Sequence, residues 1–343
     1  MSLPAPTRAG FLGTGLMARH HLRTMLDRDD STVVAVCEPS EAQWAIAATE
    51  FAVRNLPLPP NEPDWQRFVT RFGPKIDAGL VCTPHALHHD QTVALLEAGV
   101  DVLLEKPMVL DATEAESLIA ARDRTGRLLV VAFPGSLSPQ VRTAAAMIRA
   151  GEVGAILNID SMVWQDWHTQ SRGTWRQVPE LSGGGFLFDT GAHMLNTVAD
   201  LVGEDISEVV AWLVDDGTPV DMRGVVMARI ASGGLITMNA CGRTIPSLGS
   251  DIRVFCERAT LRTGMWGERL EIQREGEDSL APVESVVPGT VWEQFLDVRA
   301  GRIANPSPPE IGLRMAHLWD AIRASAASGG AVVRVATLIR EPA

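Results

Sequence analysis

A glycine-rich turn between a short strand and a helix constrains this chain more than any other feature of its sequence. The apolar residues 9–12 run into Gly13, Gly15 and Ala18, which follow the spacing G-x-G-x-x-A, and helical periodicity begins directly after them. Gly13 permits a tight turn, Gly15 lets a pyrophosphate approach the backbone, and the small Ala18 allows the helix to pack closely on the strand. The pattern predicts a dinucleotide site with its phosphates at the helix N-terminus. The residues expected to contact the cofactor here are Gly13, Thr14, Gly15, Leu16, Met17 and Ala18.

The rest of the first third alternates short apolar runs with helical stretches. The runs are residues 9–12, 32–36, 80–82, 102–104 and 128–132. Continuous apolar strands of this kind suit a parallel sheet that is buried on both faces. Between two of them, residues 111–124 place Ala115, Leu118 and Ile119 on one helical face. We therefore expect an α/β Rossmann domain, with a doubly wound parallel sheet, over residues 1–128.

Beyond about residue 151 the predicted strands follow one another without helices between them. The runs are residues 156–163, 209–214, 224–230, 235–240, 252–256 and 270–274, and Gly, Asp and Pro turns separate them. This order is typical of an α+β domain with a large, mostly antiparallel sheet, which we place at residues 129–343. Apolar residues recur at helical spacing near residues 310–327, so a C-terminal helix is expected to pack back on one of the domains.

Charge and cysteine usage exclude several kinds of partner. The chain has 343 residues, a formal net charge of −12 and no run rich in Lys or Arg, whereas nucleic acids and anionic membranes are bound by clustered positive charge. No stretch approaches the roughly 20 apolar residues of a membrane-spanning helix. We expect neither nucleic acid nor membrane as a partner. The cysteines Cys37, Cys82, Cys241 and Cys256 form no CxxC pair, which favours reduced thiols in a cytoplasmic protein.

An acidic residue at the end of the second predicted strand bears on the choice of cofactor. Glu38 follows Gly15 by 23 positions, where a carboxylate accepts hydrogen bonds from a ribose diol and repels the 2′-phosphate of NADP. Residues 40–45 contain no Arg or Lys that could pair with such a phosphate. The sequence therefore predicts NAD as the cofactor, with NADP disfavoured. A solvated Glu at a strand end is the alternative interpretation.

Two further segments carry residues suited to proton transfer. Lys106, one of only two lysines, stands at the end of an apolar strand, where a doubly wound sheet presents groups to its ligand. Asp189 and His193 are four residues apart and share a face if a helix runs through residues 189–201. An imidazole beside a carboxylate suits a general base for a hydroxyl proton. A surface lysine and a structural Asp/His pair are the alternatives that these residues alone leave open.

Several motifs recur together along the chain. They are Gly13-x-Gly15-x-x-Ala18, Thr83-Pro84 followed by His88, Ala98-Gly99 ahead of Glu105-Lys106-Pro107, Gly151-Glu152-Val153-Gly154, Trp175-Arg176, and Gly183-Gly184-Gly185 before Asp189 and His193. Over nearly the whole chain they resemble the glucose-fructose oxidoreductase, inositol dehydrogenase and MocA (Gfo/Idh/MocA) family. The resemblance implies a catalytic pair of Lys106 and His193 that Asp189 supports. It also implies that the cofactor is bordered by Thr83, Pro84, His88, Glu105 and Lys106.

The chain departs from this family at two points. Where many relatives carry an arginine shortly before a proline, residues 133–139 read FPGSLSP, so a substrate contact there has no counterpart. The chain also contains no tyrosine. The tyrosine proton donor of some relatives is therefore absent, and the chemistry falls to Lys106 and His193.

Aromatic and polar residues gather ahead of Asp189. Aromatic faces with polar neighbours suit the C–H face and the hydroxyls of a sugar or cyclitol ring, although single tryptophans could equally belong to the core or to a subunit interface. The expected substrate contacts are Trp164, His168, Trp175 and Arg176.

The sequence predicts no metal site. His85, His88 and His89 are clustered, but they open a helix beside the expected cofactor site. No set of carboxylates or thiolates completes a coordination shell around them.

The resemblance implies NAD-dependent hydride transfer between the nicotinamide and a secondary hydroxyl of a sugar, cyclitol or related polyol. Lys106 would stabilise the charge that develops on the reacting oxygen, and His193 would take the hydroxyl proton. Two alternatives stay open: an NAD-dependent glycosidase that uses transient oxidation, and a non-catalytic nucleotide-sensing regulator of the same fold. The second domain would bind the substrate. Homodimers or homotetramers are expected through the outer face of its sheet, because similar proteins use that surface.

Overall fold

The computed structural model describes residues 5–284 and 289–336, and the chain divides into two compact units. The first unit comprises Met1–Val109, Thr113–Ala132 and Gly289–Pro309, and the second comprises Leu110–Ala112, Phe133–Pro288 and Glu310–Ala343. The sequence placed the boundary between residues 128 and 129 and assigned residues 289–309 to the second domain. In the structure the first unit extends to Ala132, and residues 289–309 pack with it.

A five-stranded parallel sheet forms the centre of the first unit. Its strands are β1 (Thr7–Leu12), β2 (Ser31–Cys37), β3 (Ala78–Val81), β4 (Asp101–Glu105) and β5 (Leu129–Ala132), in the order β2-β1-β3-β4-β5. The register places Leu12 beside both Cys37 and Val81, so the carboxyl ends of the strands meet at one edge. Strands β3 and β5 are buried along their whole length, as expected for a sheet that helices cover on both faces.

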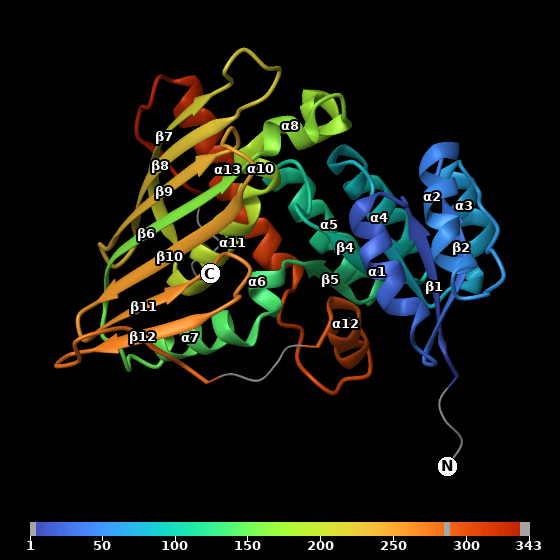
Figure 1. Cartoon of the computed structure of the whole chain (residues 1–343), viewed down its shortest axis with the longest axis horizontal. Helices are drawn as coiled ribbons and strands as arrows, with labels where there is room; N and C mark the ends of the chain where they lie inside the picture. Colours follow the sequence, from blue (N-terminus) through green and yellow to red (C-terminus); the bar gives the residue numbers. More distant parts are fainter. Residues whose placement is uncertain (1–4, 285–288, 337–343) are drawn as a thin grey trace. The chain divides into compact units, whose positions relative to one another are not determined.

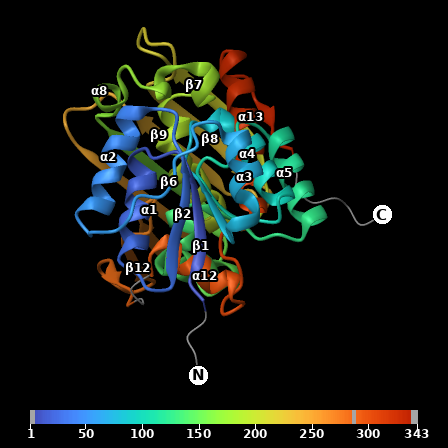
Figure 2. The same ribbon diagram turned by 90° about the vertical axis from the view of Figure 1, so that its right-hand side faces the viewer.

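Helices cover the two faces of this sheet (Figure 2). On one side lie α1 (Leu16–Leu26) and α2 (Glu41–Ala52), and on the other lie α3 (Trp65–Phe72), α4 (His88–Glu97) and α5 (Ala112–Thr125), with the short turns η1 (Gly73–Lys75) and η2 (His85–Leu87) between them. Helix α12 (Val291–Arg299) completes the unit. Its Trp292 and Phe295 stack at 5.1 Å and belong to the same core as Phe11 of β1.

A nine-stranded sheet forms the second unit. Its strands are β6 (Ile156–Gln165), β7 (Ile206–Val214), β8 (Arg223–Ile230), β9 (Leu235–Cys241), β10 (Leu248–Cys256), β11 (Ala259–Thr263), β12 (Leu270–Arg274), β13 (Ala281–Pro282) and β14 (Val333–Arg334). Their order is β13-β12-β11-β10-β6-β9-β8-β7-β14, and every neighbouring pair is antiparallel except β6 and β9. Exposed and buried residues alternate strictly along β8, because one face of the sheet carries helices and the other carries none among the described residues (Figure 1).

The helices of the second unit lie on one face of its sheet. They are α6 (Pro134–Leu137), α7 (Pro139–Arg149), α8 (Trp167–Ser171), α9 (Pro179–Ser182), α10 (Phe186–Asp189), α11 (Gly191–Val202) and α13 (Pro309–Ala327), with the turn η3 (Trp175–Gln177). Helix α13 is the expected C-terminal helix, and it packs on the second unit. Its Trp319 stacks on Phe188 of α10 at a centroid distance of 4.7 Å.

The observed fold confirms the predicted class, a doubly wound parallel sheet followed by a large mostly antiparallel one. The helix expected through residues 189–201 is in fact two helices, α10 and α11, which are separated at Thr190. The Thr190 hydroxyl donates a hydrogen bond of 2.9 Å to Gln165 Oε1 of β6. Asp189 therefore ends one helix, and His193 lies in the first turn of the next.

Candidate active site

The turn between β1 and α1 is open for an anionic ligand. Gly13 has a φ of +86°, and a Cβ at this position would lie 2.7 Å from the carbonyl oxygen of Cys82, so only glycine fits. A Cβ on Gly15 would meet nothing within 4 Å. No side chain caps the N-terminus of α1, and its first turn contains no acidic residue. Backbone N–H groups therefore face the space where a pyrophosphate is expected to bind.

Glu38 lies beside this turn and contacts it directly. Its Oε2 accepts hydrogen bonds from the backbone N–H of Thr14 at 2.8 Å and from the Thr14 hydroxyl at 2.9 Å, and its Oε1 accepts one from Ser40 N–H at 2.8 Å. Asn61, which the sequence did not single out, holds the Glu38 backbone through two further hydrogen bonds. Since each carboxylate oxygen accepts two hydrogen bonds, Oε1 keeps capacity for a ribose hydroxyl.

His88 braces the two segments that follow β3 and β4. Its side chain is buried, with Nδ1 2.8 Å from the Pro107 carbonyl oxygen and Nε2 3.0 Å from the Thr83 carbonyl oxygen. Burial lowers the pKa of His88, and a neutral ring can donate to only one of these oxygens. The sequence placed Thr83, Pro84 and His88 at the cofactor. The structure brings these residues together at the sheet edge and gives His88 a bracing position between two backbone segments.

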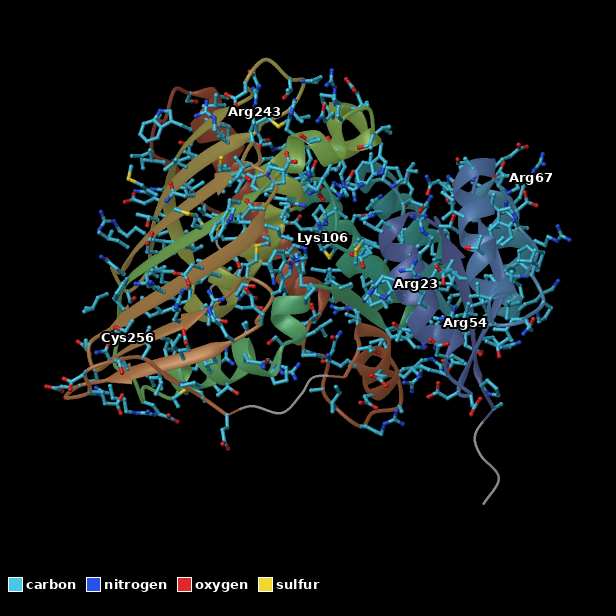
Figure 3. All side chains as sticks on the ribbon, in the orientation of Figure 1. Arg23, Arg54, Arg67, Lys106, Arg243 and Cys256 are labelled. Carbon is cyan, nitrogen blue, oxygen red and sulfur yellow. The ribbon has the colours of Figure 1, made fainter. Side chains whose placement is uncertain are left out.

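Lys106 follows β4 at the same edge (Figure 3). Glu105, the last residue of β4, is buried and contacts His21 of α1. The sequence did not point to His21, because nothing in the local pattern of α1 shows which residue lies opposite Glu105.

The glycine-rich segment before Asp189 is shaped by close backbone contacts. A Cβ on Gly185 would lie 1.9 Å from the carbonyl oxygen of Asp221, so the two backbones can meet only at a glycine. The Asp221 carboxylate accepts hydrogen bonds from Gly185 N–H at 2.7 Å and from Leu187 N–H at 3.1 Å. Burial nevertheless raises the pKa of Asp221. These contacts set the start of α10 and hence the position of Asp189 at its end.

Asp189 is buried and bound by two donors. Its Oδ2 accepts hydrogen bonds from Trp167 Nε1 at 2.8 Å and from Arg176 Nε at 2.9 Å. The Arg176 guanidinium in turn lies over the Trp175 ring, 4.5 Å from its centroid. The predicted residues Trp175, Arg176 and Asp189 therefore form one group. Trp167 was missed as an individual contact because only the fold shows which tryptophan faces the carboxylate.

His193 lies between two aromatic rings. Its imidazole is 6.4 Å from the Phe133 ring, in a T-shaped arrangement, and 5.9 Å from the Trp266 indole. Trp266 is carried by the turn between β11 and β12, and Thr197 of α11 holds that turn through a hydrogen bond to the Met265 carbonyl oxygen. Trp266 is more than 70 residues from His193 in sequence, so no motif connects the two.

One expected substrate contact, Trp164, lies apart from this group. Successive strand residues point to opposite faces, and Trp164 alternates with the buried Val163 and with Gln165, which contacts Thr190. Trp164 therefore lies on the outer face of the sheet, against Gly249 of β10, and is not a neighbour of Asp189. The backbone N–H of His168, another expected substrate contact, donates a hydrogen bond of 2.8 Å to the Gly242 carbonyl oxygen.

The segment that departs from the family pattern points into the protein. Ser136 is buried, donates a hydrogen bond to Asp200 Oδ2 and accepts one of 2.8 Å from Asn196 Nδ2. Ser138 donates to the Gly267 carbonyl oxygen at 3.1 Å. These serines anchor α6 and α7 to the rest of the second unit, so they are occupied by structural contacts.

Within residues 5–284 and 289–336, no group of three or more His, Cys, Asp or Glu side chains is arranged to hold a metal ion. No helix in this part of the chain has the length and apolar character needed to cross a bilayer. All four cysteines are free.

Family models match both units. Residues 7–133 match the model of the GFO_IDH_MocA oxidoreductase family with its NAD-binding Rossmann fold. Residues 141–262 match the GFO/IDH/MocA C-terminal domain. The first unit is therefore an NAD-binding domain, as the sequence predicted.

Curated relatives share partial similarity with the chain. Levoglucosan dehydrogenase of Pseudarthrobacter phenanthrenivorans is 29% identical over 50% of this chain and 42% of its own length. D-glucoside 3-dehydrogenase of Escherichia coli is 26% identical over 58% of this chain and 55% of its own. The scyllo-inositol 2-dehydrogenase (NADP(+)) of Bacillus subtilis is 32% identical over 38% of this chain and 36% of its own. The chain thus spans about half, or less, of the length of these relatives.

Solved structures agree with the whole fold. Levoglucosan dehydrogenase in complex with NADH has a TM-score of 0.80, at 22% identity over 97% of this chain and 100% of its own. Aldose-aldose oxidoreductase from Caulobacter crescentus also has a TM-score of 0.80, at 20% identity over 96% of this chain and 100% of its own. At these identities the comparison shows a shared fold.

Proposed function

Because the chain belongs to the Gfo/Idh/MocA family of NAD-binding oxidoreductases, we propose that it oxidises a secondary hydroxyl of a sugar, cyclitol or related polyol. The observation that carries this proposal is the buried Asp189, which Trp167 and Arg176 hold at the end of α10, just before the helix that bears His193. The names of the relatives, which include levoglucosan, glucoside and inositol dehydrogenases, support the substrate class.

The cofactor and two side chains share the proposed chemistry. The nicotinamide of bound NAD supplies the hydride acceptor. Lys106 donates a hydrogen bond to the reacting oxygen and stabilises its developing negative charge. The His193 imidazole takes the hydroxyl proton as general base. Asp189 lies four residues before His193, and its hydrogen bonds from Trp167 and Arg176 fix the end of α10.

The proposal is tested by following nicotinamide absorbance with purified protein, NAD and a panel of hexoses, anhydrosugars, glucosides and inositols. Formation of NADH with at least one ring-shaped polyol is expected. Release of a sugar from a glucoside without net NADH would identify an NAD-dependent glycosidase instead. Tight NAD binding with no turnover on the whole panel would contradict an enzymatic role and favour a nucleotide-sensing regulator.

We expect the protein to bind NAD at least about tenfold more tightly than NADP, a difference of roughly 1.4 kcal/mol. Glu38 is buried beside the turn and would face the 2′-phosphate of NADP. The nearby Arg19 is engaged by the Thr14 carbonyl oxygen and by Gln43 Oε1, each at 2.8 Å. Calorimetric titration of both dinucleotides measures the preference.

The matched variant for this prediction is Glu38→Gln, which keeps acceptor capacity toward Thr14 and removes the charge. Its preference for NAD should shrink, because like-charge repulsion is lost while the turn is retained. Equal affinity of the unmodified protein for the two dinucleotides would contradict the assignment of Glu38.

We propose that the chain associates through the outer face of the nine-stranded sheet. Apolar side chains on adjacent strands of this face are 41 to 48% exposed, and they are Met162, Trp212, Val225, Met227 and Leu235. A single sheet with one uncovered apolar face favours a covering partner. Light scattering at micromolar concentration should therefore give two or four times the 37.0 kDa mass of one chain.

The charge-bearing variant Met227→Glu should shift this assembly toward smaller species. Val53→Glu is the control, because Val53 is also exposed but lies at the end of α2 in the first unit. A single 37.0 kDa species for the unmodified protein would contradict the proposed association.

The free cysteines suit a reducing compartment, and the cytoplasm is the location we propose.

A further inference from the structure

A buried hydrogen-bonded pair of side chains lies next to the backbone of Lys106. His21 Nε2 of α1 is 2.7 Å from Glu105 Oε1 at the end of β4, and the two residues are 84 positions apart in the sequence. Their side chains are only 4% and 9% exposed. The second carboxylate oxygen, Oε2, accepts a hydrogen bond of 3.2 Å from the backbone N–H of Lys106. One carboxylate therefore connects the phosphate-binding helix to the backbone of the lysine.

The charges around Glu105 come from four segments. His21 lies on α1, Lys106 follows β4, Cys82 follows β3 and His88 begins α4, and each interacts electrostatically with Glu105. Burial alone would raise the pKa of Glu105, but the hydrogen bond and charge of His21, together with Lys106, outweigh burial and hold this pKa below its usual value. Burial and the Glu105 charge both raise the pKa of the Cys82 thiol, so Cys82 offers no compensating anion.

We propose that His21 is a positioning residue for Lys106, which it controls by holding the Glu105 carboxylate in place. The role of Lys106 itself rests on the proposed function. Helix α1 receives the pyrophosphate at its N-terminus and carries His21 in its second turn. Through the His21–Glu105 pair, the cofactor phosphates and the lysine are held by one rigid connection, so that Lys106 keeps its place relative to the bound dinucleotide.

The physical consequence of breaking the pair is specific. A buried carboxylate that loses its partner stays ionised only at a high cost, and it takes up a proton instead. Without His21, the pKa of Glu105 should rise because burial then dominates. A protonated Glu105 carboxyl offers fewer acceptor sites to the backbone N–H of Lys106. It also no longer places a negative charge near the Lys106 ammonium. Loss of His21 should therefore act on Lys106 in a pH-dependent way.

The first test compares His21→Gln with His20→Gln, since His20 is the exposed neighbour on the same helix. For His21→Gln we expect kcat to fall about tenfold at neutral pH, while the dissociation constant of NAD changes less than about threefold. Its activity should also gain a limb that rises with pH as Glu105 ionises. The wild type lacks this limb because the pKa of its Glu105 is already low. His20→Gln should behave as the wild type.

The second test does not depend on turnover. Because Lys75 and Lys106 are the only lysines, reductive methylation with ¹³C-formaldehyde gives one NMR signal from each, and the exposed Lys75 serves as an internal reference. The Lys106 signal should move in His21→Gln and in Glu105→Gln but not in His20→Gln. The Lys75 signal should stay in place in all three variants.

The double variant His21→Gln/Glu105→Gln separates positioning from general destabilisation. It contains no buried unpaired charge, so it folds even if His21→Gln does not, and it should lack the new pH limb. A limb that persists in the double variant would overturn the proposal, and so would a His21→Gln protein with the wild-type pH profile and an unmoved Lys106 signal. If the wild type oxidises no substrate, the proposed function fails, and the Lys106 signal alone decides the role of His21.

Discussion

Replacing His193 with Asn is expected to lower kcat by about 10² to 10⁴, the usual effect of removing a positioned general base. The imidazole lies between Phe133 and Trp266 in the first turn of α11, where an amide can fill the space but cannot take the proton. NAD affinity should stay within about threefold, because the phosphate-binding turn belongs to the other unit. Steady-state kinetics on a confirmed substrate and calorimetry with NAD measure the two effects.

The control for this variant is His317→Asn, because His317 lies on α13 in the same unit and has no part in the proposed chemistry. Its kcat should match that of the wild type. A general base works only when it has lost its proton, so the wild-type rate should rise with pH, and this rise should disappear in His193→Asn. Near wild-type turnover with an unchanged pH profile would show that another residue is the base.

Replacing Lys106 with Met should also lower kcat by about 10² to 10⁴, because the developing charge on the reacting oxygen then loses its donor. Lys106→Arg should restore little of this activity, since the planar guanidinium is larger and directs its donors differently from an ammonium. NAD should bind somewhat more weakly, because Lys106 stands at the edge of the sheet where the cofactor is expected.

The matched control is Lys75→Met, which removes the other lysine of the chain from the exposed turn η1. Rapid-quench measurement of the first turnover separates the chemical step from product release. A Lys106→Met protein whose first turnover is as fast as that of the wild type would contradict the role of this lysine. If the Lys106→Met protein had a raised KM and an unchanged kcat, Lys106 would be a residue that only binds the substrate.

The sequence by itself determined the features that depend on neighbouring residues. The spacing of Gly13, Gly15 and Ala18 after an apolar run predicted the turn, because its chemistry requires small residues at those steps. Continuous apolar runs predicted buried parallel strands, and a succession of strands with turns but no helices between them predicted the large antiparallel sheet. Lys106 could be singled out because it stands at a strand end in a chain that has almost no other lysine.

Tertiary structure alone decided which distant side chains meet. Nothing local indicates that Trp167 of α8 faces Asp189 whereas Trp164 lies on the uncovered face of β6. Likewise, His21 and Glu105 become partners only when α1 packs beside the end of β4. Trp266 approaches His193 only because β11 and β12 lie in the same sheet as β6 and present their turn to α11.

Tertiary structure also decided which unit helix α12 belongs to. Helix α12 was assigned by position to the second domain, yet its Trp292 and Phe295 fill the core of the first unit beside Phe11. An amphipathic pattern predicts that a helix will bury one face, and it carries no information about which core receives that face. That outcome depends on the shape of the space that α1 and the parallel sheet leave unfilled, which exists only in the folded protein.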